Sequence, residues 1–357
     1  MTEAGARTIP VREGEDFVPE IVLGFLRTAI PDLPPGALRI RQFPTGASNL
    51  TYLLEVGGWR GVLRRPPLGP VPPKAHDMVR EARFLERLHP VFSLAPRPFA
   101  VCEDPSILGA PFHVMEYREG AVIAFGFPDG IEPSSALSRR VGETVVRTLA
   151  ELHDVNIEEA GLSDLGHPEG FLERQTHGWI GRYEGAKTEE IPEVGPLTAW
   201  LARRVPESPP PSIIHNDYHL KNLLFDAGNP SRIVAVLDWE MATIGDPLMD
   251  LAISLSYWLE PGDPPALSEF LSTITREPGF PGRRDFAELY ARESGRDLGE
   301  MAWYLPFAYF KLAVILQQIY ARWVRGQTRD PRFEGMGRTV RAIVEHSWSL
   351  ARSGGGL

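Results

Sequence analysis

Hydrophobic and polar positions in the first third of the chain predict short strands around one helix. Four segments alternate apolar and polar side chains or are rich in β-forming residues: 38–44, 49–56, 59–64 and 112–117. Between the last two, apolar residues from Asp77 to His89 recur at helical spacing. A sheet combined with one helix predicts a small α+β domain.

The rest of the chain favours helices. Apolar residues at helical spacing mark four segments: 138–153, 285–292, 303–325 and 337–350. Two short apolar runs, 223–225 and 233–237, predict strands joined by a turn. Segment 301–321 has Lys311 as its only charge, but Pro306 and two adjacent glutamines would be costly in lipid. We therefore expect a buried helix there and no membrane span.

Composition narrows the class of protein. The 357 residues are 43% hydrophobic and 24% charged, which excludes global disorder and suits two domains. The formal net charge of −10 argues against nucleic-acid binding, which depends on clustered Lys and Arg. A single cysteine, Cys102, cannot form an internal disulfide, and residues 1–16 lack the apolar run of a signal peptide. These features predict a cytoplasmic protein.

The charge is unevenly distributed along the chain. Residues 1–115 hold 13 Lys and Arg against 12 Asp and Glu, a net charge of +1. Residues 116–357 hold 24 against 35, a net charge of −11. The acidity therefore belongs to the second part.

The residues with the clearest chemistry lie between Ile213 and Asp238. Asp217 and Asn222 are five residues apart on one polar loop, and Asp238 ends the apolar strand that follows. The oxygens of Asn222 and Asp238 suit Mg²⁺, which prefers few protein ligands together with phosphate and water. Asp217 would remain to orient a substrate hydroxyl and accept its proton.

Other chemistries fit the sequence less well. His215 and His219 are four residues apart, a spacing that zinc sites use, but their segment precedes short strands and lacks a Glu directly after the first His. A phosphate-binding Gly-Lys pair and a Gly-x-Ser-x-Gly nucleophile motif are absent. The Gly335-x-Gly337 pair has no third glycine and follows no strand, so it is not a dinucleotide fingerprint.

The loop pattern resembles a known family. His215-x-Asp217 followed by Asn222, and then Asp238-Trp239-Glu240, resembles the catalytic signature of the protein-kinase-like phosphotransferases. The details are similar to the aminoglycoside phosphotransferase and choline kinase branch, which acts on small molecules. The resemblance covers roughly residues 39–348. Residues 64–67 and 303–323 look most like the kinase-like domain fused to some acyl-CoA dehydrogenases.

This resemblance implies a fold and an activity. The expected fold is α+β and bilobal, protein-kinase-like, with a small antiparallel-sheet N-terminal lobe (1–115) that binds the nucleotide. A larger, mostly helical C-terminal lobe (116–357) would carry the catalytic loops and the acceptor site. The expected reaction is Mg²⁺-dependent transfer of the ATP or GTP γ-phosphate to a hydroxyl of a small molecule. No nucleic acid and no membrane are expected as partners.

The resemblance also assigns roles to single residues. The residues implied in nucleotide binding are Gly46, Ser48, Asn49, Arg64, Glu81, Glu116 and Tyr117. Arg64 stands where kinases have a phosphate-binding lysine, and Glu81 would pair with it. On other readings the glycine loop is a plain hairpin turn, Glu81 a solvated helix residue, and Glu116-Tyr117 a linker.

The resemblance gives three further residues a supporting role in the active site, and two alternative functions stay open. His215 would hydrogen-bond the backbone near Asp238, Asp250 would brace the catalytic loop, and Lys221 would either be exposed or contact the γ-phosphate. The alternatives are a kinase for a hydroxyacyl thioester and a nucleotide-binding pseudokinase that acts as a scaffold, which the departure at Arg64 keeps open. The acidic second part mildly favours cationic acceptors, although salt screens distant charges within roughly 10 Å.

Overall fold

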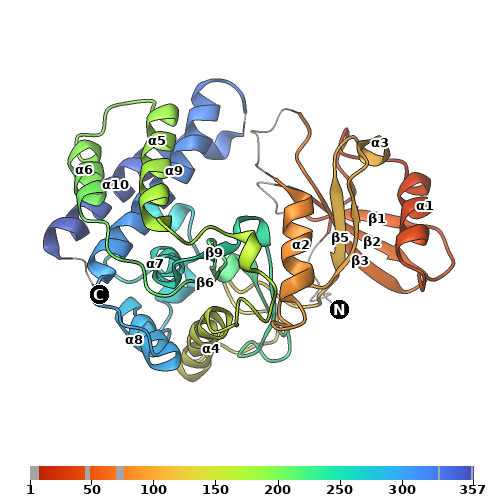
Figure 1. Cartoon of the computed structure of the whole chain (residues 1–357), viewed down its shortest axis with the longest axis horizontal. Helices are drawn as coiled ribbons and strands as arrows, with labels where there is room; N and C mark the ends of the chain where they lie inside the picture. Colours follow the sequence, from red (N-terminus) through yellow and green to blue (C-terminus); the bar gives the residue numbers. More distant parts are fainter. Residues whose placement is uncertain (1–7, 45–48, 70–75, 329, 355–356) are drawn as a thin grey trace.

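The N-terminal part of the chain forms a five-stranded antiparallel sheet (Figure 1). The computed structural model describes residues 8–44, 49–69, 76–328, 330–354 and 357. In sheet order the strands are β1 (Arg39–Gln42), β2 (Leu50–Val56), β3 (Trp59–Arg65), β5 (Phe112–Glu116) and β4 (Pro98–Cys102). Gly57 and Gly58 close the β2–β3 hairpin with φ of +52° and +92°. Such values suit glycine, so a tight two-residue turn sets the register of these strands.

The two faces of the sheet pack against different elements. Alternation along β3 sends Leu63 into a cluster with Val22 and Leu26 of α1 (Pro19–Ala29), a helix that our sequence reading missed. Val62 points to the opposite face, where α2 (Met78–Leu88) covers the sheet. The helix predicted for 77–89 is thus confirmed, and the Asp77 side chain caps it by accepting the N–H of Arg80.

The second part of the chain is mostly helical (Figure 1). Its long helices are α4 (Ser135–His153), α5 (Phe171–Ala186), α6 (Val194–Arg203), α7 (Pro247–Tyr257), α8 (Arg283–Ser294), α9 (Met301–Val324) and α10 (Met336–Ser353). The first of them begins three residues before the predicted start, because Ser134 Oγ accepts the N–H of Leu137. The segment around Pro306 is the buried helix α9, as expected. In the described part of the chain, no helix is long and apolar enough to cross a membrane.

Two short strand pairs lie between the helices. β6 (Ser212–Ile214) pairs with β9 (Thr243–Gly245), and β7 (Leu223–Phe225) pairs with β8 (Ile233–Val236). These strands hold the polar loops described below.

The predicted arrangement of a small antiparallel sheet and a larger helical part is confirmed. The two parts nevertheless share one hydrophobic core. Phe84, Leu85 and Leu88 of α2 belong to the same cluster as the helices of the second part, and the ring of Phe84 stacks 6.2 Å from that of Trp239. The division between lobes at residue 115 therefore stays a proposal.

Candidate active site

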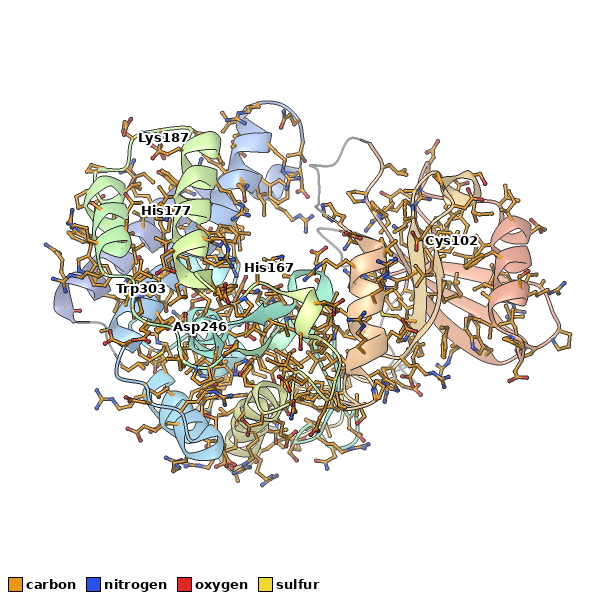
Figure 2. The ribbon with its side chains drawn as sticks, viewed as in Figure 1. Cys102, His167, His177, Lys187, Asp246 and Trp303 are labelled. Carbon is orange, nitrogen blue, oxygen red and sulfur yellow. The ribbon has the colours of Figure 1, made fainter. Side chains whose placement is uncertain are left out.

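The loop between β6 and β7 carries Asp217, and hydrogen bonds to Asp250 of α7 fix its backbone. Asp246 starts that helix by accepting the N–H of Leu248 at 2.8 Å, and it lies deep in the helical part (Figure 2). One turn later, the buried Asp250 accepts the backbone N–H of His215 at 2.6 Å and that of Asn216 at 2.7 Å. Burial would raise the pKa of Asp250, but these hydrogen bonds and His153 hold it below its usual value.

Asn216 has a backbone conformation that non-glycine residues seldom adopt, with φ of +65°. Two contacts hold it there besides the bond from its N–H to Asp250. Its side-chain Nδ2 donates to the carbonyl of Met241 at 3.1 Å, and its own carbonyl accepts from Nζ of Lys311 on α9 at 3.0 Å. We call His215, Asn216, Asp250 and Lys311 the loop cluster. Its contacts place the next residue, Asp217, at the surface of the loop.

Both ring nitrogens of His215 are already used. Nε2 lies 2.9 Å from the carbonyl of Leu237, and Nδ1 lies 3.3 Å from the N–H of Asp217. Since the first contact needs a donor and the second an acceptor, the ring is neutral, and burial lowers its pKa accordingly. This arrangement leaves no lone pair for zinc. The bond to Leu237 is the contact near Asp238 that the family resemblance implies.

Asp217 is partly exposed and already oriented. Its side chain is 24% exposed, and Nδ2 of Asn222 donates to its backbone carbonyl at 2.9 Å and to Oδ2 at 3.0 Å. Nε2 of His219 lies 3.4 Å from Oδ1. Burial would raise the pKa of Asp217, but His219 and the charge of Lys311 lower it to about 2. The carboxylate is therefore ionised and presents its oxygens to the surface.

Asp238 follows β8 and faces the sheet. Its φ is +67°, again a left-handed conformation, and its side chain is 33% exposed. Nη2 of Arg64 donates to Asp238 Oδ1 at 2.7 Å, while Nη1 donates to Glu81 Oε1 on α2, also at 2.7 Å. The predicted partners Arg64 and Glu81 thus meet, and a single guanidinium links the sheet, α2 and the end of β8.

The Arg64 pair is buried with hydrogen-bonding capacity left over. Arg64 Nε, Glu81 Oε2 and Nε2 of the neighbouring His113 are buried and have no hydrogen-bond partner among the described residues. Burial raises the pKa of Glu81, although the charge of Arg64 opposes this, and it lowers the pKa of His113 to about 3, with Arg64 adding to the effect. We call Arg64, Glu81, His113 and Asp238 the anchor cluster.

The other site residues predicted from the sequence either contact protein groups or lie outside the described residues. Nζ of Lys221 donates to the carbonyl of Phe270 at 2.7 Å, so the side chain is half-buried and not exposed, while its contact with the γ-phosphate stays a prediction. Glu116 ends β5 and pairs with Arg118 at 2.8 Å, and Tyr117 follows with Arg60 over its ring. Gly46 and Ser48 lie outside the described residues.

Glu240 and Asn49 form a contact that sequence reasoning did not find. Asn49 Nδ2 donates to Glu240 Oε2 at 2.7 Å, and His76 lies 2.8 Å from Asn49 Oδ1. Asn49, directly before β2, thereby meets the segment after Asp238. His219 and Lys311 were likewise missed as neighbours of Asp217. Of the two, only His219 could have been found from the sequence, because it is a polar residue two positions after Asp217.

The fold and the loop geometry define the class of protein. A choline kinase from Cryptosporidium parvum superimposes with a TM-score of 0.61 at 13% identity over 94% of this chain and 95% of that one, which shows the protein-kinase-like fold. An aminoglycoside phosphotransferase in complex with ADP and hygromycin B gives a TM-score of 0.60 at 16% identity. The bilobal fold expected from the sequence is confirmed.

The model of the phosphotransferase enzyme family (APH) matches residues 39–304, so the chain belongs to this family. A Ralstonia eutropha protein provisionally named an aminoglycoside phosphotransferase is 30% identical, with a TM-score of 0.80 over 95% of this chain and 99% of that one. Membership and these neighbours confirm the expected enzyme class, a small-molecule kinase.

The curated relatives contain much more than this domain. Acyl-CoA dehydrogenase family member 10 of Mus musculus is 30% identical over 98% of this chain, and family member 11 of Homo sapiens is 33% identical over 88%. The chain spans 32% of the length of the first relative and 40% of the second. The resemblance to the kinase-like domain of this type is thus confirmed, and the activities of the whole relatives are not transferred to this chain.

Proposed function

We propose that the chain transfers the γ-phosphate of ATP or GTP, with Mg²⁺, to a hydroxyl of a small molecule. The observation that carries this proposal is the geometry of Asn222. Because its Nδ2 donates to Asp217, its Oδ1 is left as an acceptor beside the ionised carboxylate. A hydroxyl-orienting carboxylate and an oxygen ligand for a cation then lie next to each other. The neighbouring structure that holds ADP and hygromycin B supports a nucleotide donor and a small acceptor.

The donor set fits Mg²⁺. Arg64 occupies Asp238 Oδ1, which leaves Oδ2 of a partly exposed carboxylate, and Asn222 offers an amide oxygen. Two hard oxygen ligands, completed by phosphate oxygens and water, are what Mg²⁺ prefers. When bound, the ion would neutralise negative charge on the phosphates. In the described residues there is no cluster of three or more His, Cys, Asp or Glu for a different kind of metal site.

The nucleotide would lie between the sheet and the helical part. Arg64 would contact its phosphates from the anchor cluster, whose unpaired Nε can donate, with Glu81 fixing the guanidinium. We assign the adenine or guanine edge to the backbone at Glu116 and Tyr117. Gly46, Ser48 and Asn49 would cover the phosphates.

Asp217 would orient the acceptor hydroxyl for in-line attack and take its proton. A carboxylate with a pKa of about 2 is a weak base, so positioning matters more than proton abstraction at the start of the reaction. This suits phosphoryl transfer, in which the attacking oxygen develops little bonding before the transition state.

The test is ADP release with a panel of hydroxylated acceptors. Asp217→Ala should lower kcat by about 10³-fold or more while the nucleotide dissociation constant stays within about twofold. Asp238→Ala should instead remove the Mg²⁺ dependence of nucleotide binding. Exposed Asp32 provides the matched control, Asp32→Ala. Full turnover by Asp217→Ala would refute the assigned role.

A hydroxyacyl thioester is a second candidate acceptor. The support is the identity of 30–33% to proteins named acyl-CoA dehydrogenase family members. Such a thioester belongs in the acceptor panel, beside aminoglycosides, choline and sugars.

We also keep the cytoplasm as the proposed location, because the one cysteine, Cys102, is a buried free thiol.

A further inference from the structure

A cavity of about 440 Å³ opens between α2, the start of α5 and β9. The polar residues that line it are Arg80, Asp164, His167, Arg174, Gln175 and Thr243. His167 lies on the segment that leads into α5, near the middle of the molecule (Figure 2). None of these residues takes part in the nucleotide or metal contacts proposed above.

The cations of this cavity lack carboxylate partners. Arg80 donates to the carbonyls of Ala242 at 2.6 Å and Leu165 at 3.4 Å, and Arg174 donates to the carbonyls of Glu169 and His167. Neither guanidinium has a carboxylate within ion-pair distance in the described ranges. Burial lowers the pKa of Arg80, although Asp77 and Glu81 oppose the shift.

The described lining contains one acid, and that acid is ion-paired. Asp164 pairs with Arg87, outside the cavity, and that hydrogen bond holds the pKa of Asp164 below its usual value. The local charge of the cavity is therefore positive, although the part of the chain around it carries a net charge of −11. A local potential of this kind selects ligands more strongly than distant charges do.

The cavity is connected to Asp217 through two short chains of contacts. On one side, Arg80 binds the carbonyl of Ala242, and the preceding residue, Met241, accepts from Nδ2 of Asn216. Asn216 directly precedes Asp217. On this side the cavity wall and the catalytic loop are thus separated by one peptide unit.

On the other side the connection runs along α5. Gln175 accepts the indole N–H of Trp179 at 3.0 Å, and the Trp179 ring lies between Arg182, at 4.5 Å, and Nζ of Lys311, at 5.4 Å. Lys311 donates to the carbonyl of Asn216. Neither Arg182 nor Lys311 has a carboxylate within 4 Å in the part of the chain that the structure covers, so two cations without an ion pair lie beside Trp179.

We propose that this cavity binds an anionic group of the acceptor, a carboxylate or a phosphate monoester, while the acceptor hydroxyl reaches Asp217. This inference rests on the proposed function and adds the substrate class to it. Guanidinium groups recognise both anions by charge-assisted, often bidentate hydrogen bonds. It also reverses the expectation of a cationic acceptor that the overall acidity of the second part suggested.

The experiment compares acceptors in matched pairs that differ by one anionic group. Glucose with glucose 6-phosphate, glycerol with glycerol 3-phosphate, and glyceramide with glycerate are read by ADP release and by calorimetric titration into the ADP-saturated protein. The proteins are wild type, Arg174→Gln, Arg80→Gln and Arg174→Lys. Arg140→Gln, at an exposed position on α4, removes the same charge elsewhere and serves as the control. Thermal unfolding verifies that each variant is folded.

We expect wild type to prefer the anionic member of at least one pair by about tenfold or more in kcat/KM or in affinity. Arg174→Gln and Arg80→Gln should each remove about tenfold of that preference, Arg174→Lys less, and Arg140→Gln none. Two results overturn the inference: no pair in which the anionic member binds more tightly, or equal preferences in Arg174→Gln and Arg140→Gln. If cationic acceptors are phosphorylated instead, the inference fails while the proposed function stands. If wild type neither binds the nucleotide nor turns over any acceptor, the proposed function itself is refuted.

Discussion

The loop cluster and the anchor cluster differ in how completely their polar groups are paired. In the loop cluster, both oxygens of Asp250 accept backbone N–H groups, and Asn216 is bonded through its N–H, its carbonyl and its side chain. In the anchor cluster, Arg64, Glu81 and His113 each keep one buried polar atom without a partner among the described residues. One cluster is saturated and the other is not.

This difference separates two tasks. A saturated network holds the strained backbone of Asn216, so the loop cluster fixes Asp217 before any ligand arrives. Unpaired buried groups cost free energy and are retained where a ligand can use them. Catalysis by alignment needs a rigid acceptor side, whereas the nucleotide side has to open and close.

Asp250→Ala breaks the saturated cluster. It leaves the N–H groups of His215 and Asn216, together with the ring of His153, buried without their acceptor. Several lost charge-assisted bonds should lower the free energy of unfolding by about 4–5 kcal/mol in urea denaturation. The exposed control Asp32→Ala should change it by less than about 0.5 kcal/mol. A loss below about 1 kcal/mol for Asp250→Ala would mean that the loop is not held by this network.

Arg64→Ala removes the cation of the unsaturated cluster. Glu81 then stays buried without a counter-charge, and we expect a loss of about 3–4 kcal/mol. Since burial raises the pKa of Glu81, the native state keeps its proton more tightly than the unfolded chain does. The loss should therefore be greater at pH 8 than at pH 6.

Arg64→Lys is the matched variant for this site. One ammonium cannot donate to Glu81 and Asp238 along the two separate directions that Nη1 and Nη2 provide. We expect it to recover about half of the stability that Arg64→Ala loses. Equal losses in the two variants would show that the two-directional geometry, and not the charge, is what matters.

The sequence predicted the residues that act through a local motif. The spacing of Asp217, Asn222 and Asp238 was enough to place all three at strand ends, and they do lie on the two loops that follow β6 and β8. Arg64 and Glu81 also meet, as the family resemblance implied. Local spacing carries such information because short loops at strand ends leave few arrangements.

Contacts between distant segments were not predictable in this way. Asn49 and Glu240 are 191 residues apart, and Lys311 approaches Asn216 over 95 residues. Lys311 seemed only to be the single charge of a buried helix. The place of Lys221 beside Asn222 predicted either exposure or a phosphate contact, and it did not reveal the bond to the carbonyl of Phe270. Tertiary packing decides such partners, and one sequence without relatives does not reveal it.

Lys311→Met tests the loop cluster through the pH dependence of protein stability. Burial lowers the pKa of Lys311 to about 8, although Asp217 and Asp250 favour its charged form and Arg182 opposes it. Between pH 8 and about 10.5 the unfolded chain holds this proton and the native state does not, so wild-type stability should rise with pH in that window, by up to about 3 kcal/mol. The variant should lack this rise. Parallel curves for the two proteins would show that Lys311 titrates normally.

Asn49→Ala should have the smallest effect on stability. It tests the hydrogen bond between Asn49 and Glu240 beside the anchor cluster. Asn49 is buried, and its amide links the loop before β2 to Glu240. Losing this bond to a carboxylate should cost about 1–2 kcal/mol of stability. Burial and the nearby Asp238 raise the pKa of Glu240, so the variant should lose less at acidic pH, as Glu240 takes up a proton, than at pH 8. If this contact closes the phosphate-covering loop, nucleotide affinity should fall about three- to tenfold while kcat changes less than twofold. A drop in kcat with unchanged nucleotide affinity would instead mean that Asn49 acts in the phosphoryl-transfer step. The contrast between a fixed loop cluster and a mobile anchor cluster would then fail.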